Sequence, residues 1–137
     1  MFGFTEVRVG VAPAVISVVC LPKLRTADAR SAFLRGNRFP AAEAARMGLI
    51  NAAVTADRLD AEVDAVVTDL LAGSPSAIAA SKELLREVPG TPVDEAFEWT
   101  GQLSARLFAG DDAREGMTAF LEKRPAAWVR PAPSQGA

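Results

Sequence analysis

Glycine and proline residues divide the chain after Lys23 into segments of helical length, and their positions restrict the fold more than any other feature of the sequence. Glycine follows several apolar segments at the point where a left-handed residue commonly ends a helix: Gly36, Gly48, Gly73 and Gly110. Ser74-Pro75 and Thr91-Pro92 are typical of helix starts, in which the hydroxyl caps the helix and proline occupies the first turn. These signals predict a chain that is mostly α-helical.

The apolar residues between these signals recur at helical spacing. They predict helices over residues 14–21, 26–34, 41–47, 58–72, 75–86, 92–109 and 112–123. We expect Pro40 in the first turn of the third helix, and Asp111 or Asp112 as the cap of the last. Residues 49–54 are expected to form a short strand or an extended link. No repeat or internal linker is present, so residues 1–128 are predicted to form one domain, followed by a flexible tail over 129–137.

The segment Val9–Pro22 is almost entirely apolar. It is too short for a transmembrane helix, which needs about twenty apolar residues. A secretory signal is also disfavoured, because the residues before it include Glu6 and Arg8 and their side chains carry no net positive charge. We therefore interpret the segment as buried core, in which a proline separates a strand-like part, Phe4–Val11, from a helical part, Ala14–Leu21.

Composition and charge narrow the classes of function. The chain has 137 residues, of which 50% are hydrophobic and 23% charged, as in a core-forming soluble domain. Its 15 basic and 17 acidic side chains leave a formal net charge of −2, without the basic excess that attracts DNA or RNA. We therefore expect no nucleic acid as a partner, and no membrane because the apolar segment Val9–Pro22 is too short to span one.

The chain contains no histidine and a single cysteine, Cys20. A Ser-His-Asp relay needs an imidazole and a structural zinc site needs about four Cys or His ligands, so neither is expected and no metal is predicted. Ser17 and Cys20 have no histidine base and are interpreted as helix residues of the core. One thiol cannot form an internal disulfide, which agrees with a cytoplasmic location. Carboxylates remain as the main candidates for proton transfer.

Three sequence blocks carry a resemblance to a known family. Residues 2–13 read FGFTEVRVGVAP, residues 36–51 read GNRFPAAEAARMGLIN and residues 112–123 read DAREGMTAFLEK. They resemble, in the same order, the F-G-x-x-E-[VI]-x-x-G-x-x-P, G-x-x-[FI]-x-A-x-E-A-x-x-x-G-L-[VI] and D-x-x-E-G-x-x-A-F-x-E-K motifs of the enoyl-CoA hydratase/isomerase (crotonase) superfamily. The resemblance extends to Trp128 and corresponds to the C-terminal half of that family's usual length.

The resemblance implies the α/β crotonase-like fold, a ββα spiral followed by helices that pack subunits into homotrimers or hexamers. This chain would supply the helical C-terminal half with one or two short strands. The implied function is an enoyl-CoA hydratase-type lyase, in which backbone N–H groups of an oxyanion hole stabilise the enolate of an acyl-CoA thioester and carboxylates move protons. Coenzyme A is then part of the substrate, and no separate cofactor is expected.

Glu6 is the candidate catalytic residue, because it matches the glutamate of the F-G-x-x-E motif that helps to add water across the 2,3-double bond in the hydratases. Burial between Phe4 and the valines that follow would make proton transfer by this carboxyl group effective near neutral pH. Alternatively, Glu6 and Arg8 stand two residues apart on a strand and form a surface ion pair.

Three further residues are candidates for substrate binding by the same resemblance. Pro13 ends the first motif, and Ala14 follows it where the family usually has glycine, so the Ala14 N–H takes the place of an amide that approaches the attacking water. The loss of glycines here reshapes the acyl pocket and leaves the substrate class open. Lys123 is similar in place to a lysine that meets a CoA phosphate, although it would equally complement the dipole at a helix C-terminus.

Two hypotheses of function remain open. In the first, the chain belongs to a lyase whose oxyanion hole and other glutamate lie, by the resemblance, in sequence that these residues do not include; the isolated chain is then expected to be inactive or weakly active. In the second, the chain is a non-catalytic helical oligomerisation module or a truncated fragment, whose apolar faces drive self-association or docking to a full-length relative.

Overall fold

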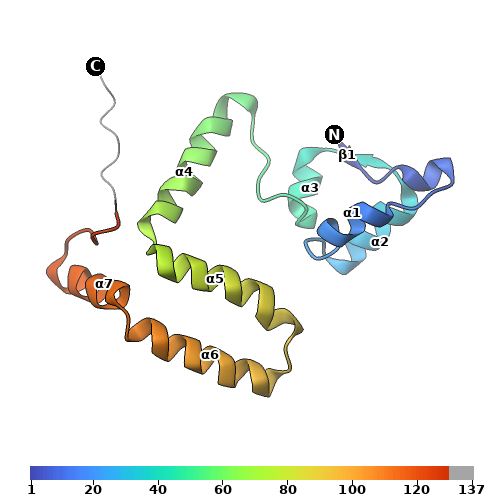
Figure 1. The fold of residues 1–137 in the computed structure, drawn as a ribbon. Coiled ribbons are helices and arrows are strands. Elements are labelled where there is room, and N and C mark those ends of the chain that lie inside the picture. The colour runs from blue at the N-terminus through green and yellow to red at the C-terminus, as the bar shows by residue number, and fades with distance from the viewer. Residues whose placement is uncertain (130–137) are drawn as a thin grey trace. The chain divides into compact units, whose positions relative to one another are not determined.

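The computed structural model describes residues 1–129 and divides the chain into two compact units, Met1–Leu59 and the residues from Asp60 onward (Figure 1). Helices form most of both units, as predicted. The assignment of residues 1–128 to one domain stays a prediction. The tail expected over residues 129–137 lies outside the described residues, apart from Val129.

The first unit combines short helices with a two-stranded sheet. Its helices are α1 (Ala14–Cys20), α2 (Thr26–Arg35) and α3 (Ala41–Met47), with the 3₁₀ helices η1 (Glu6–Val9) and η2 (Ala56–Arg58). The strands β1 (Phe2–Gly3) and β2 (Arg38–Phe39) pair antiparallel, with Phe2 opposite Phe39 and Gly3 opposite Arg38. The sequence did not indicate β2, because two residues are too few to show an alternating pattern.

The strand predicted over Phe4–Val11 is wrong, because this segment forms the 3₁₀ helix η1 instead. The Arg8 N–H donates to the Thr5 carbonyl oxygen at 3.0 Å, and Gly10 ends the turn with a φ of +83°. Branched valines favour strands only where a neighbouring strand is available to pair with them. Residues 49–54, expected to be a short strand or an extended link, form no strand and link α3 to η2.

The core of the first unit is a cluster of buried apolar residues: Phe4, Cys20, Leu24, Ala29, Ala32, Phe39, Ala44 and Met47. The Phe4 ring packs on the ring of Phe33, which is partly buried against this cluster, with a centroid distance of 4.3 Å. The segment Val9–Pro22 contributes little to this core, which corrects the expectation of a buried run. Only Pro13 and Cys20 are buried in it, whereas Val15 is 89% exposed, because α1 has one face against the unit and another open.

Left-handed glycines end two helices of the first unit, as predicted: Gly36 follows α2 and Gly48 follows α3. Gly48 has a φ of +89°, and a Cβ at this position would lie 2.6 Å from the Lys23 carbonyl oxygen. Glycine is therefore needed here for space as well as for conformation. The close approach is held by the Arg25 N–H, which donates to the Met47 carbonyl oxygen at 3.2 Å.

Arg46 joins α2 and α3 at the surface of the first unit. Its guanidinium lies 2.9 Å from an Asp28 carboxylate oxygen and 2.5 Å from one of Glu43. The hydrogen bond from Arg46 lowers the pKa of both carboxyl groups below their ordinary values. Because the side chains of Arg46 and Glu43 are well exposed, this network is expected to add little to the stability of the unit.

The second unit consists of helices: α4 (Leu59–Ala72), α5 (Pro75–Glu87), η3 (Val88–Gly90), α6 (Val93–Phe108) and α7 (Asp111–Glu122). Ser74 caps α5 as predicted, since its hydroxyl accepts a hydrogen bond from the Ala77 N–H at 3.1 Å. Two expected caps are wrong. Thr91 does not cap α6, because its hydroxyl donates to the Glu87 carbonyl oxygen of the preceding helix. Neither Asp111 nor Asp112 caps α7, because the capping position is Gly110 and both aspartates lie inside the helix.

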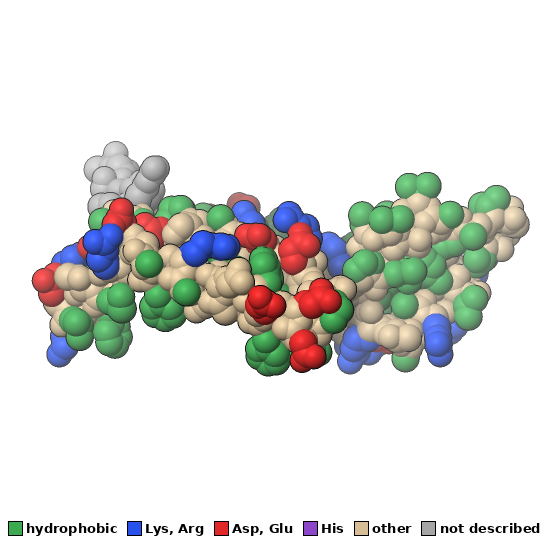
Figure 2. Space-filling view, turned by 60° about the horizontal axis from the view of Figure 1, so that its bottom comes forward, with side chains coloured by type: hydrophobic (Ala, Val, Ile, Leu, Met, Phe, Trp, Pro, Cys, Tyr) green, Lys and Arg blue, Asp and Glu red, His purple; other side chains and the backbone are tan. Residues whose placement is uncertain are grey.

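Few apolar side chains of the second unit are buried within it. The helix α4 has no buried residue, and its exposed apolar side chains are Leu59, Val63, Val66, Val67, Leu70 and Leu71. Apolar side chains also lie at the surface of the first unit, and Figure 2 shows them over much of the visible face of the chain. In the described part, no single helix is long and apolar enough to cross a membrane; by length and composition alone, the bent pair Ala56–Ala72 and Pro75–Gly90 passes the same test.

Candidate functional site

Glu6 is the first residue of η1 and is half-buried. The turn that carries it is closed by the Val11 N–H, which donates to the Glu6 carbonyl oxygen at 3.2 Å. The carboxylate oxygen Oε2 of Glu6 is buried, and no residue among 1–129 donates a hydrogen bond to it. A buried carboxylate oxygen without a hydrogen-bond donor is rare in native proteins and calls for a specific explanation.

The surroundings of Glu6 differ from those expected. Val9 and Val11 are 78% and 59% exposed, so the valines after Glu6 do not bury it; Phe4 is the buried neighbour. The alternative ion pair with Arg8 is not found in residues 1–129 either, because the 3₁₀ turn replaces the strand that would put both side chains on one face. The Arg8 guanidinium donates instead to the Arg35 carbonyl oxygen, at 3.4 Å from both Nε and Nη2.

Pro13 and Ala14 mark the start of α1 in the same unit. Pro13 is buried and Ala14 is exposed. The Ala14 N–H, which was expected to approach a water molecule, donates to the Ala12 carbonyl oxygen at 2.8 Å. Ser17 donates its hydroxyl to the Ala14 carbonyl oxygen at 2.6 Å and Cys20 is buried, which agrees with their interpretation as helix residues.

Lys123 belongs to the second unit and ends α7 in a left-handed conformation, with a φ of +54°. Its N–H is bonded to the carbonyl oxygens of Ala119 and Phe120, and the residue is exposed. The side chain forms no ion pair with any residue in 1–129. An exposed ammonium group at a helix C-terminus complements the helix dipole and is also accessible to an anionic ligand.

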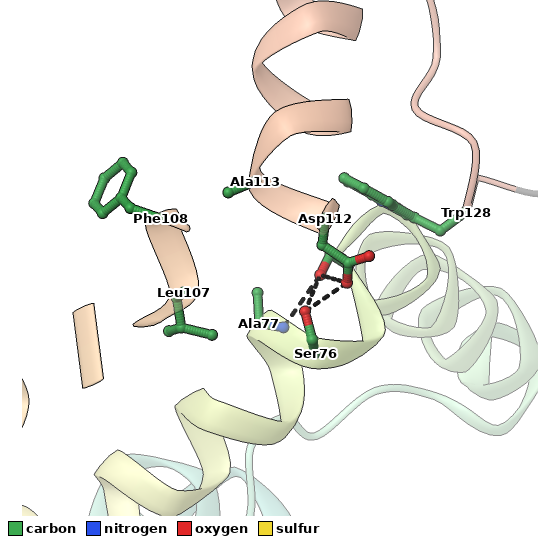
Figure 3. A pocket seen from close by; sticks show the side chains of 8 residues that line it. Ser76, Ala77, Leu107, Phe108, Asp112, Ala113 and Trp128 are labelled. Carbon is green, nitrogen blue, oxygen red and sulfur yellow. Dashed lines mark hydrogen bonds between the residues drawn. The ribbon is translucent and has the colours of Figure 1, made fainter. Parts of the chain in front are cut away.

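A pocket of about 330 Å³ opens in the second unit, and Asp112 forms its polar end (Figure 3). The Asp112 carboxylate accepts hydrogen bonds from the hydroxyls of Ser74 at 2.6 Å and Ser76 at 2.5 Å. These two hydroxyls lower the pKa of Asp112 below its ordinary value. The apolar wall consists of Ala77, Leu107, Phe108, Ala113 and Trp128. Both hydroxyls donate to the same oxygen, Oδ2, and through these bonds Asp112 links α7 to the start of α5.

The segment after α7 folds back along the second unit. Glu115 accepts two hydrogen bonds from the Arg124 guanidinium and one from the Ala127 N–H at 2.7 Å, and these bonds lower the pKa of Glu115. The Trp128 indole N–H donates to the Ala72 carbonyl oxygen at 3.1 Å. The indole ring passes close to Gly116, where a Cβ would lie 3.1 Å from it. The segment thus joins the end of α4 to α7.

No group of three Asp, Glu, Cys or His side chains among residues 1–129 has the arrangement of a metal site.

The sequence profile described as enoyl-CoA hydratase/isomerase matches residues 1–131, almost the whole chain. This chain belongs to that family.

Named relatives and solved structures of the enoyl-CoA hydratase/isomerase family agree with the match. The chain is 34% identical over 132 residues to a carnitinyl-CoA dehydratase of Escherichia coli, covering 93% of this chain and 51% of the relative. An enoyl-CoA hydratase/isomerase from Marinobacter aquaeolei superimposes with a TM-score of 0.87 at 27% identity, over 94% of this chain and 49% of that one. An enoyl-CoA hydratase of Mycobacterium smegmatis gives 0.85 at 28%, over 94% and 50%. The crotonase-like fold expected from the sequence is confirmed.

The chain spans about half the length of the curated relatives it matches. Membership of the family is therefore established for these residues. The structure places Glu6, Pro13 and Ala14 in the first unit and Lys123 in the second.

The sequence did not indicate two features of the structure. One is the link from Asp112 to Ser74 and Ser76, whose partners lie more than thirty positions away in the chain. The other is Asn37, whose side-chain oxygen Oδ1 is buried and accepts no hydrogen bond from residues 1–129. Asn37 lies within the second motif block, but the block gives no sign that its side chain is shielded from solvent.

Proposed function

We propose that this chain contributes Glu6 to the active site of an acyl-CoA lyase of the enoyl-CoA hydratase type. Family membership supports the reaction class. The position of Glu6 at the glutamate of the first motif block supports the residue. The oxyanion hole that this reaction needs would be formed by residues outside this chain.

The buried Oε2 atom of Glu6 is the observation that supports the proposal most directly. Several other carboxylates of residues 1–129 already have partners: Asp28 and Glu43 bind Arg46, Asp112 binds two serines, and Glu115 binds Arg124. A carboxylate committed to such partners is a poor base, because its ionised form is stabilised. Glu6 is not committed in this way and can exchange a proton with a reacting group.

In the proposed reaction, Glu6 acts as both base and acid. Its carboxylate takes a proton from water while the water oxygen forms a bond to C3 of the 2,3-enoyl thioester. The electron pair of the double bond moves onto the thioester as an enolate, which an oxyanion hole stabilises. The proton held by Glu6 then returns to C2, so that the sum is the addition of one water molecule.

Lys123 is proposed to bind a phosphate of coenzyme A, since its side chain is exposed and forms no ion pair in the described chain. The Ala14 N–H is a weaker candidate for contact with water, because it already donates to the Ala12 carbonyl oxygen. The name of the Escherichia coli relative suggests carnitinyl-CoA and its unsaturated product as members of the substrate panel, beside simple enoyl-CoA thioesters.

A second candidate function is assembly without catalysis. The exposed apolar side chains of α4, together with Phe97 and Phe120 at 75% and 82% exposure, favour a surface that other subunits cover. A homotrimer or hexamer of the kind expected from the family would use such a surface. Assembly through this surface is also compatible with catalysis, and the activity of Glu6 variants shows whether the protein catalyses the reaction as well.

The test measures hydration of a panel of enoyl-CoA thioesters by the product of the complete reading frame that contains this chain. Loss of ultraviolet absorbance of the conjugated thioester reports the reaction. We expect Glu6→Gln to lower kcat at least about 100-fold, the usual contribution of a general acid or base. Residues 1–137 alone are expected to show no measurable hydration, because no oxyanion hole is proposed within them.

The matched control is Glu98→Gln, the same change at an exposed glutamate of α6. It should leave kcat within about twofold of the original value, as for surface substitutions generally. Full activity of Glu6→Gln, or a complete product that hydrates no thioester of the panel, would contradict the proposed function.

A further inference from the structure

Two buried side-chain oxygens among residues 1–129 accept no hydrogen bond: Oε2 of Glu6 and Oδ1 of Asn37. Buried polar atoms of native proteins nearly always have a partner, and those without one need a specific explanation. The Asn37 side chain is already oriented, because its Nδ2 donates to the Arg38 carbonyl oxygen at 3.4 Å. This bond uses the nitrogen of the amide and leaves Oδ1 as an acceptor without a donor.

The two oxygens belong to segments that pack directly against each other. A Cβ on Gly36, next to Asn37, would lie 2.7 Å from Cγ2 of Val7, next to Glu6. The Arg8 guanidinium donates to the Arg35 carbonyl oxygen, which ties the same two segments together. Gly3 of β1 also approaches this turn closely, since a Cβ on Gly3 would lie 3.2 Å from the Asn37 carbonyl oxygen. The glycines thus bring the backbone of η1 and β1 close to the turn that carries Asn37.

We propose that Asn37 is a positioning residue of the Glu6 site and that Asn37 Oδ1 and Glu6 Oε2 together bind one water molecule. This rests on the proposed function, in which Glu6 activates water. A water molecule has two hydrogens and can donate one to each of these two acceptor oxygens. Neither oxygen accepts a hydrogen bond from residues 1–129 that the water would have to replace. Buried waters of this kind satisfy polar groups that the protein leaves without partners.

The arrangement explains how the reacting water would be oriented. When both hydrogens point to Oδ1 and Oε2, the lone pairs of the water oxygen point away from both acceptors and toward a substrate. Asn37 cannot take the proton, because an amide oxygen is a weak base, so the proton passes to Glu6. Asn37 contributes by orientation alone, and its loss should affect kcat more than KM.

The structural test is a high-resolution crystal structure of the product of the complete reading frame. We expect a water oxygen about 3 Å from both Glu6 Oε2 and Asn37 Oδ1. A protein donor on either oxygen, or a direct hydrogen bond from Asn37 Nδ2 to the Glu6 carboxylate, would overturn the proposal. A protein donor on Asn37 Oδ1 alone would leave the proposed function standing, whereas a donor on Glu6 Oε2 would also count against the proposed function, which rests on that oxygen having no partner.

The functional test uses Asn37→Leu, which removes the acceptor and keeps the approximate size of the side chain. We expect kcat to fall at least about tenfold with KM within about twofold, the effect of one lost hydrogen bond to a reacting group. Asn51→Leu is the matched control, since Asn51 is the exposed asparagine of the first unit. Thermal unfolding of both variants reports any loss of folded protein.

Asn37→Asp separates orientation from folding. It keeps an acceptor at the same place, so it should retain more activity than Asn37→Leu. The added carboxylate favours the protonated form of Glu6, which should move the acidic limb of the pH–rate profile to higher pH. If Asn37→Leu retains the activity of Asn51→Leu while Glu6→Gln is inactive, the water site is wrong and the proposed function stands; if Glu6→Gln is also active, both fail.

Discussion

The two units of this chain are stabilised in different ways. In the first, Phe4, Leu24, Phe39 and Met47 are each less than 9% exposed and form one cluster with small alanines. In the second, the only described residues buried to that degree are Ser74, Ala80, Leu103 and Ala119. The larger apolar side chains of the second unit, among them Phe97 and Phe120, remain at its surface.

Polar contacts take the place of a core in the second unit. Asp112 joins α7 to the start of α5, Glu115 holds the segment that contains Arg124, and Trp128 reaches the Ala72 carbonyl oxygen. Directional bonds of this kind fix the geometry of helices, but contribute less free energy than the burial of large apolar side chains. The comparison therefore predicts that truncating a large side chain is costly in the first unit and nearly neutral in the second.

The largest effect is expected for Phe4→Ala. The side chain is 5% exposed and packs on the Phe33 ring at 4.3 Å, so its removal should lower the free energy of unfolding of the first unit by about 3–5 kcal/mol. Phe120→Ala removes the same side chain at a site that is 82% exposed and should cost less than about 0.5 kcal/mol in the isolated chain.

The two units can be followed separately in one sample. Both tryptophans, Trp99 and Trp128, lie in the second unit and the chain has no tyrosine, so fluorescence during urea unfolding reports that unit. Hydrogen exchange measured by mass spectrometry on peptides reports the first unit. Equal losses for Phe4→Ala and Phe120→Ala would show that the contrast between the units is mistaken.

A smaller effect is expected for Asp112→Asn, which tests the polar link of the second unit. Both hydroxyls donate to the same carboxylate oxygen, Oδ2, so asparagine can still offer one acceptor oxygen to both, but the charge that strengthens the two hydrogen bonds is lost. The fluorescence transition should therefore move to lower urea, while exchange in the first unit stays unchanged. Asp94→Asn, at an exposed aspartate in the first turn of α6, is the matched control.

The effect of Asp112→Asn should depend on pH in a direction set by the folded state. The hydroxyls of Ser74 and Ser76 hold the pKa of Asp112 below its ordinary value of 3.8. The charged carboxylate then stabilises the folded unit at pH values above the unfolded pKa, and this contribution is lost as pH falls through the lower, folded pKa. The difference between the original protein and Asp112→Asn should shrink below about pH 4. A difference that stays constant from pH 7 to pH 3 would show that the charge plays no part.

The features that the sequence predicted correctly are local, and those that it missed depend on distant partners. Gly36 and Gly48 end their helices and Ser74 caps the next one because each needs only a few neighbouring residues. The 3₁₀ turn at Glu6 replaced the expected strand where Arg8 reaches the carbonyl oxygen of Arg35. No local pattern contains that contact, just as none shows that Asp112 meets Ser74.

The candidate site follows the same rule. The motif blocks pointed to Glu6, Pro13, Ala14 and Lys123 as residue types at matching positions. Packing decides whether a side-chain oxygen is shielded from solvent and whether a backbone N–H already donates a hydrogen bond within the chain. Thus the buried oxygen of Asn37 and the bond from the Ala14 N–H to Ala12 became visible only in the structure.

The smallest expected effect, and the finest test of how the second unit is packed, comes from two helical glycines. A Cβ on Gly101 in α6 would meet no atom within 4 Å, so Gly101→Ala should raise the free energy of unfolding by about 0.5–1 kcal/mol through the lower entropy of the unfolded chain. A Cβ on Gly116 in α7 would lie 3.1 Å from the Trp128 ring, so the same gain is offset by displacement of the indole and by strain on its bond to Ala72. Urea unfolding followed by fluorescence should therefore rank Gly101→Ala above Gly116→Ala. If both variants are stabilised equally, Trp128 does not pack on α7, and the second unit depends even less on apolar contacts than the structure indicates.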